Sequence, residues 1–132
     1  EAVAAAAAAL AAENLDAVKD RIYWREQAAL CVVMAAQGYP GTYKKDTEIR
    51  NIDDADTMPD VKVFHAGTKR DKDGRLLNYG GRVLGVSALG DTILEAQKNA
   101  YAAVDKISWP KGFCRRDIGW RAIETKKKAA AR

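Results

Sequence analysis

The feature that most constrains the fold is a continuous apolar run from Ala28 to Ala36. The run is short for a helix, and its adjacent valines, Val32 and Val33, favour a strand. It stops just before Gly38-Tyr39-Pro40-Gly41, which is typical of a turn. A strand with apolar residues on both faces is typical of the interior of a sheet, so we expect this segment to be a buried strand.

Shorter patterns predict the remaining strands. Apolar and polar residues alternate over Val61–His65, which indicates a strand, and Lys72–Gly74 has the composition of a hairpin turn. Val83–Leu89 is expected to form a second buried strand. Between the first two strands, Asp53–Met58 is predicted to form one helical turn that Pro59 closes.

One amphipathic helix follows the last long strand. Thr92 and Glu95 have the spacing of a capping box, which predicts that a helix begins there. Its apolar face is expected to comprise Ile93, Ala96, Ala100, Val104 and Ile107. Strands and helices that do not strictly alternate predict an α+β domain with a mostly antiparallel sheet and one packed helix.

The chain of 132 residues is long enough for one domain with an arm. Residues 1–27 are expected to form an N-terminal helical arm and linker, because alanine, the best helix former, dominates the first part. Residues 28–123 are expected to form the domain itself, and residues 124–132 a basic, disordered tail.

The net charge of +4 lies in the last eight residues, 125–132, which contain no acidic residue. Lys126, Lys127, Lys128 and Arg132 together equal the whole excess, so the remaining sequence is neutral. A nucleic-acid-binding domain normally carries its positive charge on the folded surface, so we expect no nucleic-acid partner.

No apolar run reaches the length of a membrane span, and we expect no membrane partner. Cys31, Cys114 and the single histidine, His65, do not have the spacing of a metal site, so we expect no bound metal. Two unpaired cysteines favour reduced thiols and a cytoplasmic location.

The segment Asn78–Val86 contains the strongest candidate site, at Gly80-Gly81-Arg82. Two glycines allow the backbone to turn tightly and to bring amide groups close to an anion. The guanidinium of Arg82 is a planar donor suited to phosphate or carboxylate. The alternative is a hairpin turn followed by a solvated arginine.

Two further segments contain polar side chains that could contact a ligand. His65, Thr68 and Lys69 follow one another at the end of a predicted strand, although a lone histidine is more often a hydrogen-bonded structural residue. The stretch Cys114–Arg121 combines three arginines with Asp117, for which an ion pair that holds the C-terminal segment is the alternative to anion binding. No nucleophile–base pair is found, so no catalytic residue is assigned.

Several short blocks of this sequence occur together in a characteristic order. The blocks are Cys31-Val32-Val33-Met34-Ala35, Gly38-Tyr39-Pro40-Gly41, Val63-Phe64-His65-Ala66-Gly67-Thr68, Gly80-Gly81-Arg82-Val83-Leu84-Gly85-Val86, Ala88-Leu89-Gly90 and Arg115-Arg116-Asp117-Ile118-Gly119. In this order they closely resemble the C-terminal domain of phosphoribosylamine–glycine ligase, also called glycinamide ribonucleotide synthetase. The resemblance covers about Ala28 to Ile123, and one departure is Tyr79, where the family usually has a small or polar residue.

The resemblance implies an ATP-grasp ligase of de novo purine biosynthesis. In that reaction ATP activates glycine to an acyl phosphate, and the amine of phosphoribosylamine attacks it to give glycinamide ribonucleotide, ADP and phosphate. The family's nucleotide clamp and Mg²⁺ carboxylates lie upstream of the C-terminal domain. We therefore expect ATP and Mg²⁺ to be cofactors of the intact enzyme, and this chain to bind neither and to be inactive alone.

The resemblance also implies which partners and residues matter. The expected partners are the N-terminal and ATP-grasp domains of the same enzyme, with phosphoribosylamine as substrate. Within this chain, Arg82 is expected to contact the substrate phosphate together with Gly80 and Gly81, while Lys69 and His65 are weaker candidates nearby.

Two alternatives to this function are open from the sequence. One is a free-standing, non-catalytic anion-binding or interaction module that has the same fold. The other is a structural C-terminal cap in which Arg82 pairs with a carboxylate of the protein.

Overall fold

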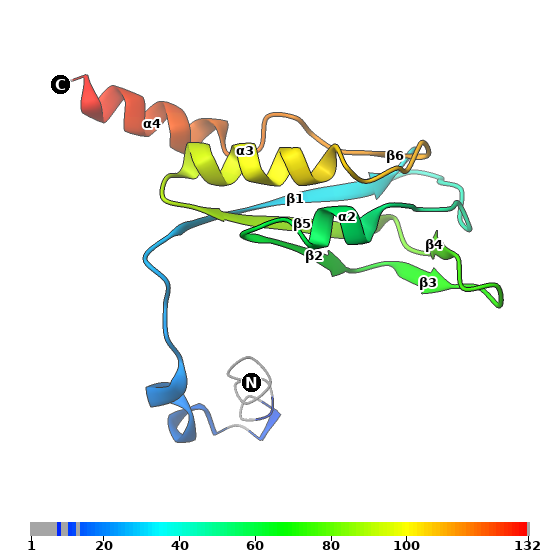
Figure 1. Ribbon diagram of the computed structural model, residues 1–132, viewed down its shortest axis with the longest axis horizontal. Helices are drawn as coiled ribbons and strands as arrows, with labels where there is room; N and C mark the ends of the chain where they lie inside the picture. The colour runs from blue at the N-terminus through cyan, green and yellow to red at the C-terminus, as the bar shows by residue number, and fades with distance from the viewer. Residues whose placement is uncertain (1–7, 9–10, 13, 132) are drawn as a thin grey trace.

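A computed structural model describes residues 8, 11, 12 and 14–131, and its centre is an antiparallel sheet with a helix over one face (Figure 1). The strands lie in the order β2 (Val61–His65), β5 (Arg82–Gly90), β1 (Ala28–Ala36) and β6 (Gly112–Phe113). A second sheet pairs β3 (Thr68–Arg70) with β4 (Leu76–Asn78) around the predicted hairpin turn. The predicted α+β class, with its antiparallel sheet and packed helix, is confirmed.

The described helices are short. They are the 3₁₀ turns η1 (Leu15–Ala17) and η2 (Lys19–Arg21), and the α-helices α2 (Ile52–Asp56), α3 (Ile93–Val104) and α4 (Trp120–Ala130). None of these described helices has the length and apolar character needed to cross a membrane.

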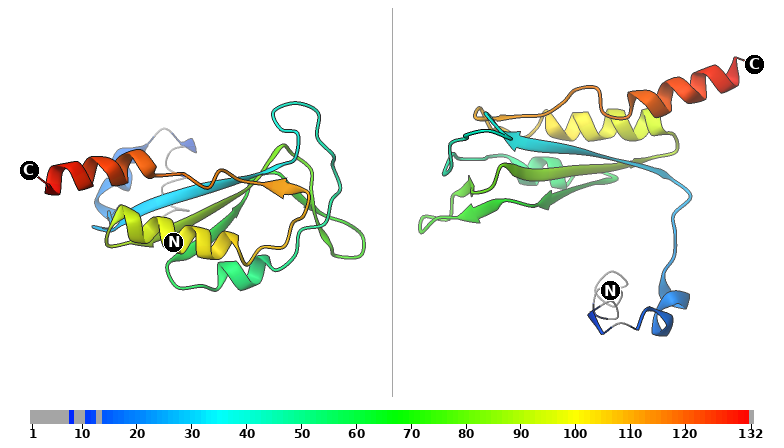
Figure 2. Two further views of the ribbon diagram at one scale, coloured as in Figure 1. Left: turned by 90° about the horizontal axis from the view of Figure 1, so that it is seen from above. Right: turned by 180° about the vertical axis from the view of Figure 1, so that it is seen from behind.

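The core lies between the sheet and α3. Val32 of β1 lies opposite Val86 of β5, which in turn lies opposite Val63 of β2, so one row of valines crosses three strands. These side chains are buried in one cluster with the small residues of α3, among them Ala96 and Ala100. The small side chains let α3 lie close over the strands, as the view from above shows (Figure 2).

The start of α3 depends on local sequence signals. The side chain of Thr92 accepts a hydrogen bond from the amide of Glu95 at 3.1 Å, as the capping box predicts. The carboxylate of Glu95 accepts a hydrogen bond from the amide of Asp91 at 2.9 Å. A capping box would instead use the amide of Thr92, one residue later. Gly90 precedes this turn, and a side chain there would collide with the backbone of Ala96, so glycine allows the close strand–helix contact.

The chain ends differ from the expected arm and tail. The predicted disordered tail is wrong for residues 124–130, because α4 continues through them from Trp120. Alanine, lysine and glutamate are good helix formers. This local preference accounts for α4, because no residue of α4 is buried against the rest of the domain. At the other end, residues 15–21 form η1 and η2, whereas most of the predicted Ala-rich helix lies outside the described residues.

Candidate functional site

The turn between β4 and β5 is held against the end of β2 by two closely packed glycines. The carbonyl oxygen of Gly67 accepts hydrogen bonds from the amides of Tyr79 at 2.7 Å and Gly80 at 3.0 Å. A Cβ atom at Gly67 would lie only 2.6 Å from the carbonyl oxygen of Arg82, so this contact requires glycine. The amide of Gly80 is therefore already used within the chain.

Gly81 allows an aromatic ring to lie beside the turn. A Cβ atom at Gly81 would overlap the ring of Tyr39, and it would lie 3.0 Å from the ring of Tyr43. The carbonyl oxygen of Gly81 accepts a hydrogen bond from the amide of Ala36 at 2.8 Å. This packing connects the segment Gly38–Gly41, expected only to be a turn, to the candidate site.

Arg82 begins β5 next to Ala35 of β1 and lines a cavity of about 220 Å³. The other residues that line this cavity are Cys31, Val33, Ala35, Tyr39, Phe113, Cys114, Arg115 and Ile118. Its walls are mostly apolar, and among the described residues no hydrogen-bond or ion-pair partner is found for the guanidinium of Arg82. Arg82 therefore presents an unpaired positive charge to a cavity on a rigid strand.

The second arginine of this cavity is already paired. Nε of Arg115 donates to Oδ1 of Asp117 at 3.0 Å and Nη2 donates to Oδ2 at 2.7 Å. These hydrogen bonds hold the pKa of Asp117 below its ordinary value. The predicted Arg–Asp pair in the C-terminal segment is therefore present, and it balances the charge of Arg115.

Lys69 lies beside Tyr79 and is also paired. Its Nζ atom lies 2.6 Å from Oδ1 of Asp46 and 5.2 Å from the centre of the Tyr79 ring. The Nζ atom of Lys45 lies 4.7 Å from the same ring centre. Tyr79 thus brings two lysines together next to Gly80 through cation–π contacts.

His65 faces a different part of the surface. Its Nδ1 atom lies 2.9 Å from Oγ1 of Thr68, and the histidine lines a polar cavity of about 440 Å³ with Arg50 and Arg70. This cavity shares no residue with the cavity of Arg82. The structure therefore does not bring His65 and Arg82 into one pocket.

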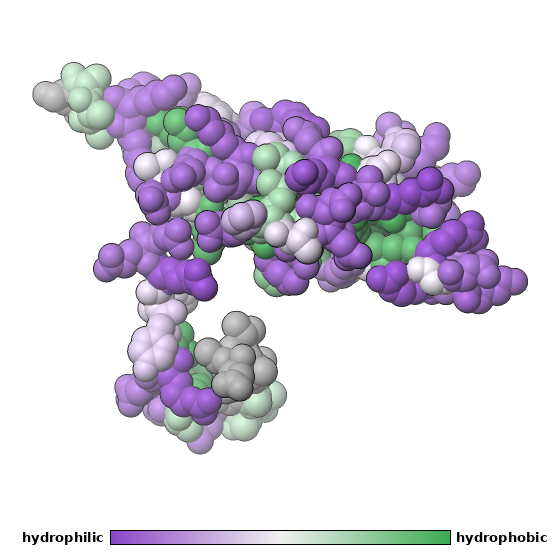
Figure 3. Space-filling view, viewed as in Figure 1, coloured by the Kyte–Doolittle hydropathy of each residue, from purple (hydrophilic) through white to green (hydrophobic). Residues whose placement is uncertain are grey.

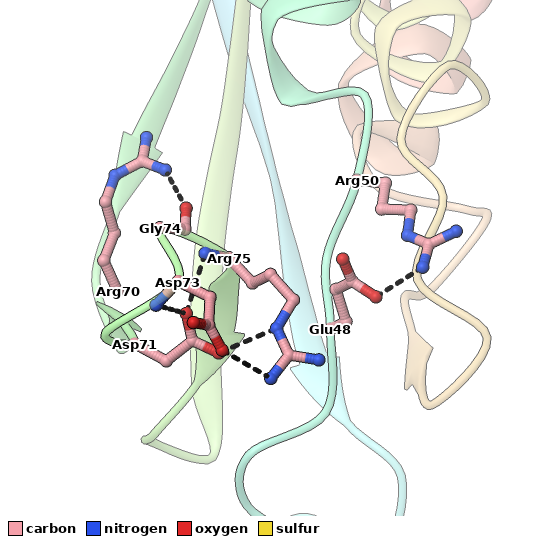
Figure 4. Close-up of polar contacts among 7 residues, drawn as sticks. All are labelled: Glu48, Arg50, Arg70, Asp71, Asp73, Gly74 and Arg75. Atoms are coloured by element: carbon pink, nitrogen blue, oxygen red, sulfur yellow. Dashed lines mark hydrogen bonds and ion pairs between the residues drawn. The ribbon is translucent and has the colours of Figure 1, made fainter.

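The polar groups near the His65 cavity are largely occupied by one another (Figure 4). Arg50 donates to Glu48 at 2.6 Å, and Arg70 donates to the carbonyl oxygen of Gly74 at 2.9 Å. Arg75, at the base of the hairpin, pairs with Asp71 at 2.8 Å. Figure 3 shows that the hairpin surface is mostly hydrophilic, which is typical of a solvated loop. Arg82 is the stronger candidate for an anion ligand.

Sequence reasoning did not identify Asn78, the one buried polar or charged residue described. Its Oδ1 atom accepts hydrogen bonds from the amide of Thr47 at 2.8 Å and from the hydroxyl of Thr47 at 2.6 Å. Its Nδ2 atom donates to the carbonyl oxygen of Lys44 at 2.9 Å. Asn78 therefore fixes the loop that contains Lys45 next to the glycine turn. An asparagine inside an apolar strand, directly before Tyr79, was the available signal.

Metal binding finds no support in the described part of the chain. No group of three or more histidine, cysteine, aspartate or glutamate side chains there is arranged to hold a metal ion.

Residues 29–121 match the family described as "Phosphoribosylglycinamide synthetase, C domain". The chain belongs to this family. The resemblance recognised from the sequence blocks is thereby confirmed.

Similar proteins include ligases from a bacterium and from a plant. The chain is 53% identical over 119 residues to the phosphoribosylamine–glycine ligase of Agrobacterium fabrum. This match covers 90% of this chain and 27% of the Agrobacterium protein. It is 51% identical over 107 residues to the chloroplastic phosphoribosylamine–glycine ligase of Arabidopsis thaliana, covering 80% of this chain and 20% of the plant protein. The chain thus spans about a quarter or less of the length of these curated relatives.

A solved structure supports the same fold. The crystal structure of phosphoribosylamine–glycine ligase from Thermotoga maritima matches with a TM-score of 0.58 and 37% sequence identity. The match covers 67% of this chain and 21% of the Thermotoga chain. The fold of this chain therefore agrees with its assignment to the C-domain family.

Proposed function

We propose that this chain is the C domain of a phosphoribosylamine–glycine ligase and forms one wall of its phosphoribosylamine site. The intact enzyme would join glycine to 5-phosphoribosylamine with hydrolysis of ATP to ADP and phosphate, a step of purine biosynthesis. ATP and Mg²⁺ would bind to the N-terminal and ATP-grasp parts, so the chain alone would be inactive. We propose a cytoplasmic location for the enzyme.

The unpaired guanidinium of Arg82 is the observation that supports this role most directly. It lies at the exposed start of a strand whose next residues are buried, and it lines a mostly apolar cavity in which a phosphate would find a cation that no carboxylate neutralises. The alternative of a structural cap requires a carboxylate partner for Arg82, and no such partner is found among the described residues.

The other residues predicted to contact the substrate would contribute less to its binding than Arg82. Gly80 and Gly81 would shape the turn before Arg82, because the amide of Gly80 already donates to Gly67 and Gly81 packs against the ring of Tyr39. Lys69 would contribute little net positive charge, because Asp46 pairs with it. His65 would contribute least, because it lines a separate cavity.

The test uses a chimera in which this chain replaces the C domain of the Agrobacterium fabrum ligase. Arg82→Ala is expected to raise the KM for phosphoribosylamine about tenfold to a hundredfold, since loss of hydrogen bonds to a charged group costs roughly 1.5–3 kcal/mol. The KM values for ATP and glycine should stay unchanged.

Arg115→Ala is the matched control, because Arg115 lines the same cavity but is neutralised by Asp117. It should change the KM for phosphoribosylamine much less than Arg82→Ala does. If Arg82→Ala instead lowers the melting temperature and leaves this KM unchanged, Arg82 is structural and the proposed site is wrong.

A further inference from the structure

Tyr79 lies on the surface next to the glycine turn and is 55% exposed, with two lysine ammonium groups over its ring. The ammonium group of Lys69 is neutralised by Asp46. The Nζ atom of Lys45 lies 4.7 Å from the ring centre, and no carboxylate partner for it is found among the described residues. Lys45 therefore carries a positive charge that an aromatic ring holds without neutralising it.

The backbone on each side of Lys45 is fixed by Asn78. The side chain of Asn78 donates to the carbonyl oxygen of Lys44, and the amide of Asp46 donates to the carbonyl oxygen of Asn78 at 2.9 Å. Asp46 has a φ of 62°, in the left-handed region that few non-glycine residues adopt. Such a conformation persists where surrounding contacts impose it, and it is frequent at binding sites. The fold thus specifies the position of Lys45.

The loop that contains Lys45 also borders the cavity of Arg82. Tyr39, at the start of this loop, lines that cavity and packs on Gly81. In Figure 1 the loop after β1 and the turn before β5 lie at the same end of the sheet. Only two residues separate Tyr79 from Arg82, so their Cα atoms lie within about 11 Å of each other. Lys45 and Arg82 are therefore held at the two ends of one short turn.

The charge of the proposed substrate exceeds what Arg82 alone can balance. A phosphate monoester carries a charge of about −1.5 to −2 at pH 7, whereas a guanidinium carries a single positive charge. Arg115 lines the same cavity, but it is paired with Asp117. Lys45 lies at the glycine turn and has no described carboxylate partner, so it can supply the second positive charge.

We infer that Lys45 is a second cation at the phosphate of phosphoribosylamine, and that Tyr79 is the positioning residue for its ammonium group. The inference rests on the proposed function, which has the phosphate at Arg82. A free lysine side chain loses considerable conformational entropy when it binds a ligand. The cation–π contact with Tyr79 reduces this loss, because it orders the side chain of Lys45 before the substrate arrives.

Kinetic measurements on the Agrobacterium fabrum chimera test the role of Lys45. Lys45→Ala should raise the KM for phosphoribosylamine at least about fivefold, because a charged contact with the phosphate is lost. The KM values for ATP and glycine should stay unchanged. Lys45→Arg retains the positive charge and the contact with the ring, so it should keep the KM for phosphoribosylamine within about threefold of the unsubstituted value.

Lys44→Ala is the matched control. It removes the same charge one residue away, from an exposed side chain that has no described contact with the ring of Tyr79. A solvated charge of this kind is screened by salt, so Lys44→Ala should change the KM for phosphoribosylamine less than about twofold. Melting temperatures of both lysine variants should equal that of the unsubstituted chimera.

Substitutions of Tyr79 test its positioning role. Tyr79→Phe keeps the ring and should change the KM for phosphoribosylamine less than about twofold, whereas Tyr79→Ser should raise it at least about threefold. Combined with Lys45→Ala, Tyr79→Ser should cause no further rise, because Tyr79 acts through Lys45. A full additional rise in the double variant would show that Tyr79 acts by another route and would overturn this role.

An unchanged KM for phosphoribosylamine in Lys45→Ala would overturn the inference. An equal rise in Lys44→Ala and Lys45→Ala would also overturn it, because only the overall charge would then matter. Failure of the proposed role of Arg82 is distinguishable. If Arg82→Ala raises this KM and Lys45→Ala does not, only the second cation is wrong. If Lys45→Ala raises it and Arg82→Ala does not, Lys45 contacts the substrate and the assignment of Arg82 is wrong.

Discussion

Asn78→Ala is expected to destabilise the domain more than truncation of any single exposed polar side chain. Asn78 is fully buried, and it makes three hydrogen bonds to a loop that is distant in sequence. The substitution leaves the amide of Thr47 and the carbonyl of Lys44 without their partners. The hydroxyl of Thr47 also accepts a hydrogen bond from the indole of Trp109 at 2.8 Å, so the loss reaches a buried aromatic residue.

The magnitude follows from the number of groups left unpaired. A buried donor or acceptor without a partner costs about 1–3 kcal/mol, and partial entry of water favours the lower part of this range. Two such groups, together with the lost contacts of the side chain, give about 2–4 kcal/mol in the free energy of unfolding.

Asn99→Ala is the matched control. The Nδ2 atom of Asn99 makes one hydrogen bond, to the carbonyl oxygen of Leu89 at 2.9 Å, and its side chain is half-buried. Its truncation is expected to cost about 1 kcal/mol. Urea unfolding followed by circular dichroism measures both variants, and their urea dependence (m value) should stay unchanged.

A double-mutant cycle with Thr47→Val assigns the effect to the contact itself. A coupling energy between Asn78 and Thr47 of about 1 kcal/mol is expected, because Thr47→Val removes the hydroxyl that donates to Oδ1 of Asn78 and leaves the backbone amide of Thr47 in place. If Asn78→Ala costs no more than Asn99→Ala, or if the coupling is absent, the view that this network holds the loop is refuted.

Three further predictions concern the packing and the pH dependence. Ala100→Leu places a large side chain between α3 and the sheet and should cost about 1–3 kcal/mol in chemical denaturation, and a neutral result would mean that this helix face is wrongly assigned. Gly81→Ala forces a methyl group into a neighbouring tyrosine ring and should lower the melting temperature, whereas an unchanged value would contradict the described packing. The pKa of Asp56 is lowered by hydrogen bonds from Lys62 and from the amide of Val63, so its stabilising contribution is present above about pH 4 and is lost as the pH falls through the lowered value. Asp56→Asn should therefore reduce the loss of stability between about pH 6 and pH 3, and an unchanged pH profile of thermal unfolding would refute this.

Much of the fold was predictable because its signals are local. The strand Ala28–Ala36 has the bounds read from its apolar run, and Val61–His65 agrees with its alternation. The Thr92 cap placed the start of α3 correctly. The end of the chain differs from the prediction although its signal is also local: residues 124–130 are helical because alanine, lysine and glutamate favour a helix whatever their charge.

Of the candidate site, the sequence determined which residues carry positive charge, but the tertiary structure decided which of these charges are free. Asp46 pairs with Lys69 and Asp117 pairs with Arg115, whereas no described residue pairs with Arg82. The carbonyl oxygen of Gly67 accepts a hydrogen bond from the amide of Gly80. His65, which is hydrogen-bonded to Thr68, lines a separate cavity. Helix and strand patterns depend on neighbours within a few residues, and the sequence contains these directly. Ion pairs and hydrogen bonds between loops depend on how distant segments pack, which only the folded chain determines.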